Sequence, residues 1–318
     1  MRVRLCFCGL SFLLSLCVVP NLLGAEASYE RTDEVIYGRK HGMALTMDVF
    51  VPSEKQNGAG IILVASGGWY SSRAGIFVQA ARVYLDRGYV VFGVVHGSQP
   101  KFSIPEIVDD MHRAVRFIRA NALNYKVDPN RLGITGGSAG GHLSLMQGTA
   151  GNAGDPDAKD PVDRVSSRVQ AVACFFPPTD FLNYGKTGEK ALGDGILENF
   201  KAPFDFSSFN EADRRFERID DQEKRVAIGR EISPVYHVTK DDPPSLIIHG
   251  DADKLVPIQQ ARLVIDRLSE LKVPAKLVVR KGAEHGWPTI IDDVRILADW
   301  FDQYLGKGNN PPNKKDSK

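Results

Sequence analysis

The sequence predicts an α/β fold with a mostly parallel central sheet, helices on both faces and a lid or cap insertion. Continuous apolar runs of strand length recur along the chain after Glu34, as expected of strands that are buried on both faces. Segments with helical spacing separate these runs, and such alternation is typical of a parallel sheet covered on both sides. A long, charged stretch at residues 183–230 interrupts the alternation. An insertion of that size in a compact domain is usually a lid or cap.

The predicted strands differ in pattern. Residues 35–37 and 45–50 form two early strands, and the second alternates apolar and polar residues, so we expect it at an antiparallel edge of the sheet. The continuous apolar runs follow at residues 61–64, 89–95, 132–135, 169–175, 245–248 and 275–279.

Three helices are predicted in the gaps. Pro105 and Pro257 each open one, because the fixed φ of proline suits the first helical position. Apolar residues between Ile107 and Ile118 recur at the spacing of a single helix face. A final helix is predicted from about Ile291 to Tyr304.

Residues 1–25 have the features of a secretory signal. Two arginines precede an apolar run at residues 10–19, Pro20 ends that run, and Ala25 or Ala27 offers a cleavage point. The run is shorter than the roughly 20 apolar residues that a membrane span needs. We therefore expect a secreted or periplasmic protein without a membrane anchor after signal cleavage.

Composition and net charge exclude several kinds of partner and site. The chain has 318 residues, 43% of them hydrophobic and 25% charged, which allows a sizeable core. Its formal net charge of +1 gives no long-range attraction to nucleic acid or an anionic membrane. Cys174 is the single cysteine after the signal, so neither an internal disulfide nor a metal site of several cysteines is possible. We expect one domain over residues 28–305 and a disordered tail at 306–318.

Residues 136–140 have the sequence Gly-Gly-Ser-Ala-Gly, between a predicted strand and a helix-compatible run. A G-x-S-x-G segment in that context is the signature of a nucleophile elbow. Glycines remove the Cβ atoms that would clash in so sharp a turn, and the serine lies exposed at the start of the helix. Glycine-rich packing is the alternative. The context favours Ser138 as a nucleophile.

A serine nucleophile needs a base, almost always a histidine that a carboxylate orients. His285 follows the last predicted strand, in a loop with two glycines. Loops at the C-terminal ends of parallel strands meet at one edge of the sheet, where Ser138 is also expected. Asp251 and Asp253 both follow the penultimate strand, and spacing alone does not choose between them.

The negative charge of an acyl-transfer transition state needs N–H donors. Ala139, directly after the nucleophile, supplies the first. The loop after residues 61–64 has the sequence Ser-Gly-Gly-Trp-Tyr, so Gly68 or Trp69 is expected to supply the second, with a plain glycine turn as the alternative. Tyr70, His96 and Trp287 are expected to line a substrate pocket with aromatic walls.

Six parts of the chain together carry a family resemblance. They are residues 66–69, Asp110, residues 136–142, residues 178–182, residues 249–257 and residues 285–286. The chain resembles an α/β-hydrolase of the esterase/lipase superfamily, and in particular secreted carboxylesterases of the feruloyl and acetyl-xylan esterase-like group. The resemblance implies that Asp253 is the acid of the triad, in the order Ser138, Asp253, His285, and that no cofactor or metal takes part.

The chain also departs from that family's pattern. Ser66 stands where the oxyanion loop of the family usually begins with histidine, and a His96-Gly97 pair stands where Tyr-Arg is common. The insertion at residues 183–230 is longer than usual. We expect these departures to change how the oxyanion loop is supported and which substrates the protein accepts, and to leave the three catalytic residues unaffected.

The sequence thus predicts a serine hydrolase that cleaves small or carbohydrate-linked carboxylic esters, such as acetylated or feruloylated sugars. A serine peptidase of the prolyl-oligopeptidase kind shares the order of the three residues, but this chain has no room for the large gating domain of that class. A non-catalytic relative that only binds ligands is the second alternative, against which the intact Ser138, Asp253 and His285 argue.

Overall fold

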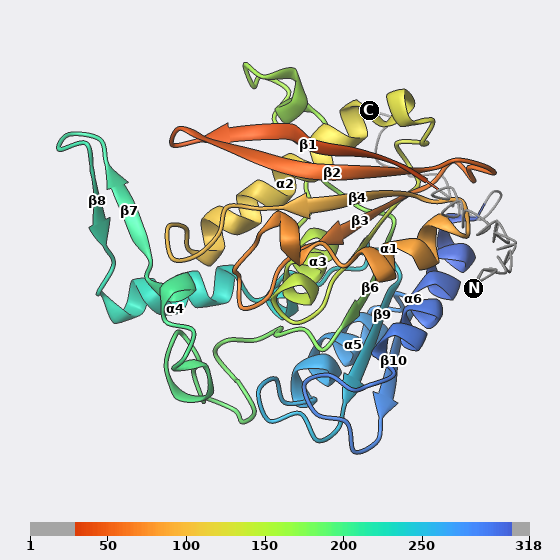
Figure 1. The fold of residues 1–318 in the computed structure, drawn as a ribbon. Coiled ribbons are helices and arrows are strands. Elements are labelled where there is room, and N and C mark those ends of the chain that lie inside the picture. Colours follow the sequence, from red (N-terminus) through yellow and green to blue (C-terminus); the bar gives the residue numbers. More distant parts are fainter. Residues whose placement is uncertain (1–28, 307–318) are drawn as a thin grey trace, which may run out of the picture.

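The computed structural model describes residues 29–306. The predicted signal at residues 1–25 and the tail beyond Gly306 lie outside the described residues. An eight-stranded sheet forms the centre of the molecule (Figure 1). In chain order its strands are β1 (Tyr29–Lys40), β2 (Met43–Pro52), β3 (Gly60–Val64), β4 (Val90–Val95), β5 (Leu132–Thr135), β6 (Ala171–Phe175), β9 (Ser245–Gly250) and β10 (Ala275–Arg280).

The sheet is mostly parallel, as predicted. Its spatial order is β1-β2-β4-β3-β5-β6-β9-β10. The β1–β2 and β2–β4 pairs are antiparallel, and the pairs from β4 through β10 are parallel. The strand predicted at residues 45–50, β2, does lie in the antiparallel part of the sheet, but β1 rather than β2 forms the edge, because β2 pairs on both sides.

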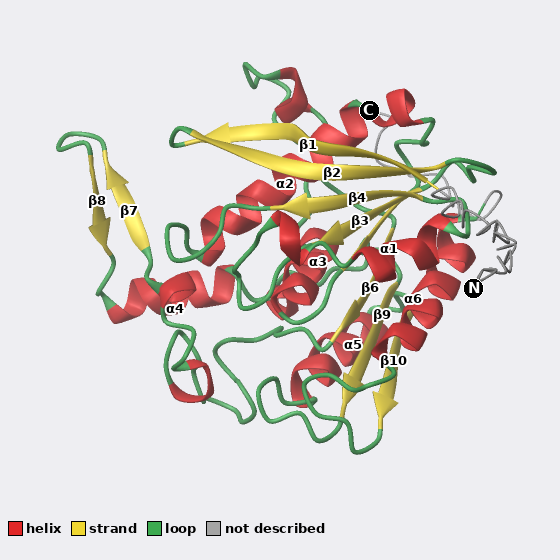
Figure 2. Cartoon of the chain, viewed as in Figure 1, coloured by secondary structure: helices red, strands yellow, loops and turns green. Residues whose placement is uncertain are grey.

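Helices cover both faces of this sheet (Figure 2). They are α1 (Val78–Leu85), α2 (Ile104–Ala120), α3 (Ala139–Thr149), α4 (Gln222–Glu231), α5 (Gln259–Glu270) and α6 (Ile290–Leu305). Helices α1 and α6 pack with one apolar core, and α2, α3 and α5 pack with the other. No helix within residues 29–306 has both the length and the apolar character to cross a membrane.

The insertion at residues 183–230 contains regular structure that the sequence did not predict. A hairpin of β7 (Ser207–Asn210) and β8 (Arg215–Arg218) precedes α4 and projects away from the main sheet (Figures 1 and 2). Phe216 of the hairpin packs edge-on against His41 in the β1–β2 turn, with ring centroids 5.4 Å apart. The hairpin is short and charged, so it lacks the apolar alternation that predicts strands.

Two further differences occur in the main domain. Strand β1 begins at Tyr29 rather than at residue 35, because its first half is an exposed edge with a charged sequence. Helix α1 was also not predicted, since its eight residues are too few for a clear apolar period.

Helix α2 is well defined by its sequence and positions two buried polar groups. Ser103 and Glu106 form a capping box at its start. Asp110 accepts a hydrogen bond from the Gly97 N–H at 2.8 Å and pairs with Lys40 Nζ at 2.7 Å. His112 Nδ1 lies 3.0 Å from Ser167 Oγ, and the ring is buried. Helix α2 thereby holds the segment that follows β4.

The His112 imidazole predicts a dependence of stability on pH. Burial, aided by the Arg116 charge and opposed by Gln147, lowers the pKa of His112 from 6.5 to about 4. Between these values the unfolded chain binds a proton that the folded chain does not, so the free energy of unfolding decreases as pH falls. We expect this decrease between pH 7 and pH 5 to be smaller in His112→Gln by about 2 kcal/mol. Urea denaturation at both pH values measures it, and equal decreases in the two proteins would contradict it.

Candidate active site

The turn between β5 and α3 is built around two close backbone approaches. A Cβ atom on Gly136 would lie 2.6 Å from the backbone of Gly140, and one on Gly140 would lie 2.9 Å from the Val64 carbonyl oxygen. Gly137 would meet nothing closer than 3.5 Å, so the turn needs glycine at the first and last positions of the motif. Ser138 between them has φ 54° and ψ −120°, a backbone region that L-residues rarely adopt.

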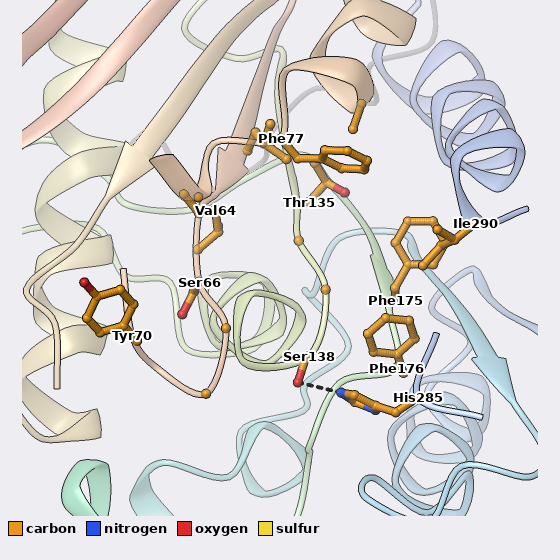
Figure 3. A pocket seen from close by; sticks show the side chains of 18 of the residues that line it. Val64, Ser66, Tyr70, Phe77, Thr135, Ser138, Phe175, Phe176, His285 and Ile290 are labelled. Atoms are coloured by element: carbon orange, nitrogen blue, oxygen red, sulfur yellow. Dashed lines mark hydrogen bonds between the residues drawn. The ribbon is translucent and has the colours of Figure 1, made fainter. Parts of the chain in front are cut away.

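The structure brings Ser138, His285 and Asp253 together. His285 Nε2 lies 2.9 Å from Ser138 Oγ, and His285 Nδ1 lies 2.7 Å from Asp253 Oδ2. Figure 3 shows the first contact, with the hydroxyl directed at the ring. A carboxylate oxygen only accepts, so Nδ1 carries the proton and Nε2 accepts from the serine hydroxyl. Asp251 accepts instead from the Gly282 N–H at 2.5 Å, so the geometry selects Asp253.

The Asp253 carboxylate is held as an anion. Its side chain is fully buried, and it accepts from the N–H groups of Leu255 and Val256 at 2.9 Å each. Burial acts to raise the pKa of Asp253, but hydrogen bonds from His249, His285 and Val256 outweigh burial and lower it well below the usual range. The buried negative charge stabilises a positive charge on His285 whenever that ring takes up a second proton.

The loop at residues 66–70 presents free N–H groups beside Ser138. Gly67 and Tyr70 bond each other in both directions, at 3.0 and 2.9 Å. Between them Gly68 has φ 54° and Trp69 has φ 60°. Within the described part of the chain, the N–H groups of Gly68, Trp69 and Ala139 have no hydrogen-bond acceptor. The predicted oxyanion donors are therefore available to a ligand.

A cavity of about 610 Å³ opens beside Ser138 and His285. Apolar and aromatic side chains form much of its wall (Figure 3), among them Phe77, Tyr84, Phe175, Phe176, Ile290 and Val294. The Phe176 ring lies 4.5 Å from the His285 ring, centroid to centroid. Phe200, from the insertion, also lines the cavity and covers Gly68 so closely that a Cβ there would lie 2.6 Å from its ring.

Two of the three predicted pocket residues do not line this cavity. Tyr70 does, and 55% of it is exposed. His96 is buried, with Nε2 2.8 Å from Ser66 Oγ. Trp287 packs behind Phe175 and Phe176, and its Nε1 donates to Asp293 at 2.8 Å. Both predictions were wrong, because a place at the end of a strand gives the edge of the sheet but not the direction of the side chain.

Sequence reasoning also missed residues that shape the cavity. Phe175 ends a predicted strand and Phe176 directly follows it, at the same sheet edge as Ser138. The argument from strand ends that identified His285 therefore also applied to these two residues. No sequence pattern marked Phe200 as a cavity residue, because its position depends on how the insertion folds onto the main domain. The Trp69 side chain is buried against Phe181 and Phe204 and takes no part in the cavity wall.

No metal centre is evident in the described residues, where no three His, Cys, Asp or Glu side chains cluster suitably. The arrangement at Ser138 combines a hydroxyl, a base, a buried carboxylate and free N–H groups. These are the parts that nucleophilic acyl transfer needs.

Comparison with known families gives a match to BD-FAE over residues 47–268. Among curated proteins, a probable carboxylic ester hydrolase, LipM of Mycobacterium tuberculosis, is 27% identical over 258 residues, which cover 79% of this chain and 54% of that protein. Isoprenylcysteine alpha-carbonyl methylesterase ICME of Arabidopsis thaliana is 22% identical and is matched over 84% of this chain and 60% of its own length. The chain thus spans about half the length of the curated relatives it matches.

Solved structures share the fold. A truncated carbohydrate esterase from gut microbiota superposes with a TM-score of 0.71 at 24% identity, covering 88% of this chain and 98% of that one. An acetyl ester-xyloside bifunctional hydrolase from Caldicellulosiruptor lactoaceticus gives 0.66 at 21% identity, covering 85% and 95%. These similarities establish the α/β-hydrolase fold.

The positive φ of Ser138 predicts an unusual effect of glycine. Ser138→Gly and Ser138→Ala both remove the hydroxyl, but only glycine adopts this conformation without strain, which costs other residues about 1–3 kcal/mol. The greater freedom of glycine in the unfolded chain offsets about 1 kcal/mol of that. We expect Ser138→Gly to have the higher free energy of unfolding, by about 1 kcal/mol. Urea denaturation compares the two variants, and a less stable glycine variant would show that the turn is not strained.

Proposed function

The chain belongs to the BD-FAE family, and from that premise we propose that it is a serine hydrolase of carboxylic esters. The observation that carries the proposal is the hydrogen-bonded series Ser138, His285, Asp253 at the wall of a cavity. The names of the matched curated proteins, which include carboxylic ester hydrolase and esterase, support the same reaction class.

In the acylation half of the reaction, Ser138 Oγ attacks the acyl carbon of the ester. His285 Nε2 accepts the serine proton as the bond forms. The N–H groups of Ala139 and of Gly68 or Trp69 stabilise the oxyanion of the tetrahedral intermediate. The intermediate collapses as the carbon–oxygen bond to the alcohol breaks, and His285 passes its proton to the departing alcohol.

In the second half, water attacks the acyl carbon of the acyl-enzyme. His285 removes a proton from that water, the same N–H groups stabilise the second oxyanion, and Ser138 leaves with the proton returned by His285. Asp253 stabilises the positive imidazole in both halves and holds its tautomer. The products are the free acid, the alcohol and unchanged enzyme, with no cofactor.

We also propose the substrate class. The cavity is much larger than an acetyl group, and its aromatic wall suits a flat acyl group as well. Tyr70 also lines the cavity and is 55% exposed, so it offers an aromatic face with a polar hydroxyl at its edge, which suits a sugar-linked ester. Small esters and acetylated or feruloylated carbohydrate fit these properties better than lipid does.

Export is proposed on the sequence of residues 1–25. The mature protein would then lie in the periplasm or outside the cell. N-terminal sequencing of protein from the periplasm or culture medium should give a first residue just after Ala25 or Ala27, and an intact N-terminus would argue against it.

Removing the nucleophile should abolish the reaction. We expect Ser138→Ala to lower kcat for p-nitrophenyl acetate by at least about 10³-fold, since the other parts of the site retain little catalysis without the attacking group. A fluorophosphonate probe should label wild-type protein at Ser138 and leave the variant unlabelled. Undiminished turnover by a folded Ser138→Ala protein, as judged by circular dichroism, would refute the proposal. Wild-type protein that the probe fails to label would revive the non-catalytic alternative.

The two aspartates provide a matched comparison. Asp253→Asn should lower kcat by about 10⁴-fold, because the amide favours the wrong histidine tautomer. Asp251→Asn should lower kcat by less than about 3-fold, since Asp251 is exposed and bonds only the Gly282 N–H among described groups. Equal effects of the two substitutions would contradict the assignment of the acid.

A substrate panel separates the proposed class from its rivals. We expect kcat/KM for p-nitrophenyl acetate and for a feruloyl ester to exceed that for p-nitrophenyl palmitate by at least about 10-fold. Proline p-nitroanilides should not be cleaved. Preference for palmitate would overturn the substrate class, and preference for the anilides would favour the peptidase alternative.

A further inference from the structure

A serine–imidazole pair lies at the first residue of the oxyanion loop. His96, just after β4, places Nδ1 2.7 Å from the Gly97 carbonyl oxygen and Nε2 2.8 Å from Ser66 Oγ. A carbonyl oxygen only accepts, so Nδ1 carries the proton of the neutral ring. Nε2 is then an acceptor, and the Ser66 hydroxyl donates to it.

A second imidazole holds the other side of the same loop. His142 of α3 places Nε2 2.7 Å from the Ile232 carbonyl oxygen, so this nitrogen carries the proton. Its Nδ1 accepts from Trp69 Nε1–H at 3.1 Å. Both His142 and Trp69 are buried, so neither partner has water as a substitute.

The loop between these two contacts has an unusual backbone conformation. Gly68 and Trp69 both have positive φ, and such conformations persist only where the surroundings hold them. Glycine adopts a positive φ without strain, so the strain falls on Trp69, and Gly68 and Trp69 are the two candidates for the second oxyanion donor. Contacts that hold Ser66 and Trp69 therefore also hold these N–H groups in place.

We propose that His96 and His142 are positioning residues, two neutral imidazoles that clamp the 66–70 loop and so set the oxyanion donors against Ser138. The proposal rests on the proposed function. It assigns a role to Ser66 and to His96, which stand where the family pattern has other residues: the imidazole that supports the loop comes from the end of β4 rather than from the loop itself.

The surroundings of both rings keep them neutral. His96 faces the Lys40 charge and the Gly97 carbonyl, and burial with that charge lowers its pKa to about 4. Asp110 lies against the next residue, bonding the Gly97 N–H and pairing with Lys40. Burial likewise lowers the pKa of His142 to about 4, against the effect of the Ile232 carbonyl. If His142 Nδ1 took up a proton, its N–H and the Trp69 indole N–H would both be donors and could no longer form a hydrogen bond with each other.

Two substitutions break the clamp while sparing the packing around it. Ser66→Ala removes the hydroxyl, and Trp69→Phe keeps a buried ring but removes the N–H. We expect each to lower kcat for p-nitrophenyl acetate by about 10- to 100-fold with KM within about 2-fold, because misplaced oxyanion donors affect the transition state more than substrate binding. Ser66→Thr retains the hydroxyl and should recover most of the lost kcat.

Ser167→Ala is the matched control. The Ser167 hydroxyl likewise contacts a buried imidazole, that of His112 at 3.0 Å, but its other hydrogen bonds go to Asn152 rather than to the loop. We expect this variant to lose stability comparably and to keep wild-type kcat. If Ser66→Ala and Trp69→Phe lost no more kcat than Ser167→Ala, the role of both rings would be merely structural and the proposal overturned.

Ring tautomers test the clamp without any activity. Nitrogen-15 spectra of histidine-labelled protein at pH 7 should show His96 protonated at Nδ1 and His142 at Nε2, both neutral. The opposite tautomer or a charged ring at either position would overturn the clamp. Should the wild-type protein hydrolyse no ester, the proposed function would fail, while these spectra would still test the hydrogen bonds by which the two rings contact the loop.

Discussion

The close approach of α3 to the end of β3 is the constraint on which the site depends. Gly140 lies so near the Val64 carbonyl oxygen that no side chain fits between them. Val64 is the last residue of β3, and the loop with the candidate oxyanion donors begins two residues later. This contact therefore brings the start of α3, which directly follows Ser138, close to the strand end from which the candidate oxyanion loop begins. The backbone pairing of β3 with β5 sets the two strands side by side, and the absence of a side chain at Gly140 lets α3 approach the end of β3.

Around that contact, buried polar groups hold the site through bonds that each demand one protonation state. Asp253 accepts from the N–H groups of Leu255 and Val256 and from His285. His249 Nε2 lies a further 3.3 Å away, and together these groups outweigh the effect of burial and lower the pKa of Asp253. His96 and His142 must be neutral to accept from Ser66 and Trp69. Among these groups only the Asp253 carboxylate is charged. The His96 and His142 rings are neutral, which avoids the desolvation cost of further buried ions.

The sequence predicted those parts of the site that follow from backbone rules. The glycine spacing in residues 136–140 reflects a steric requirement of the tight turn itself. The C-terminal ends of parallel strands lie at one edge of the sheet, and this rule located His285. Directions of side chains do not follow from such rules. His96 and Trp287 were placed at the correct edge, yet one turns toward Ser66 and the other toward Asp293. The hairpin of β7 and β8 and the position of Phe200 depend on tertiary packing of a charged segment, for which no local pattern exists.

The contacts of the oxyanion loop differ in kind, and the difference decides what the loop depends on. Ser66 and Trp69 are hydrogen-bonded to the buried rings of His96 and His142, for which losing a partner costs about 1–3 kcal/mol. Phe200 and Phe204 of the insertion meet Gly68 and Trp69 through van der Waals contact alone, in which each atom pair contributes only about 0.1–0.2 kcal/mol. The main domain therefore sets the position of the loop, and the insertion covers it. Substitutions in the insertion should accordingly alter the shape of the cavity more than the placement of the N–H groups, so that the part of the chain that departs most from the α/β pattern is also the part freest to change substrate choice.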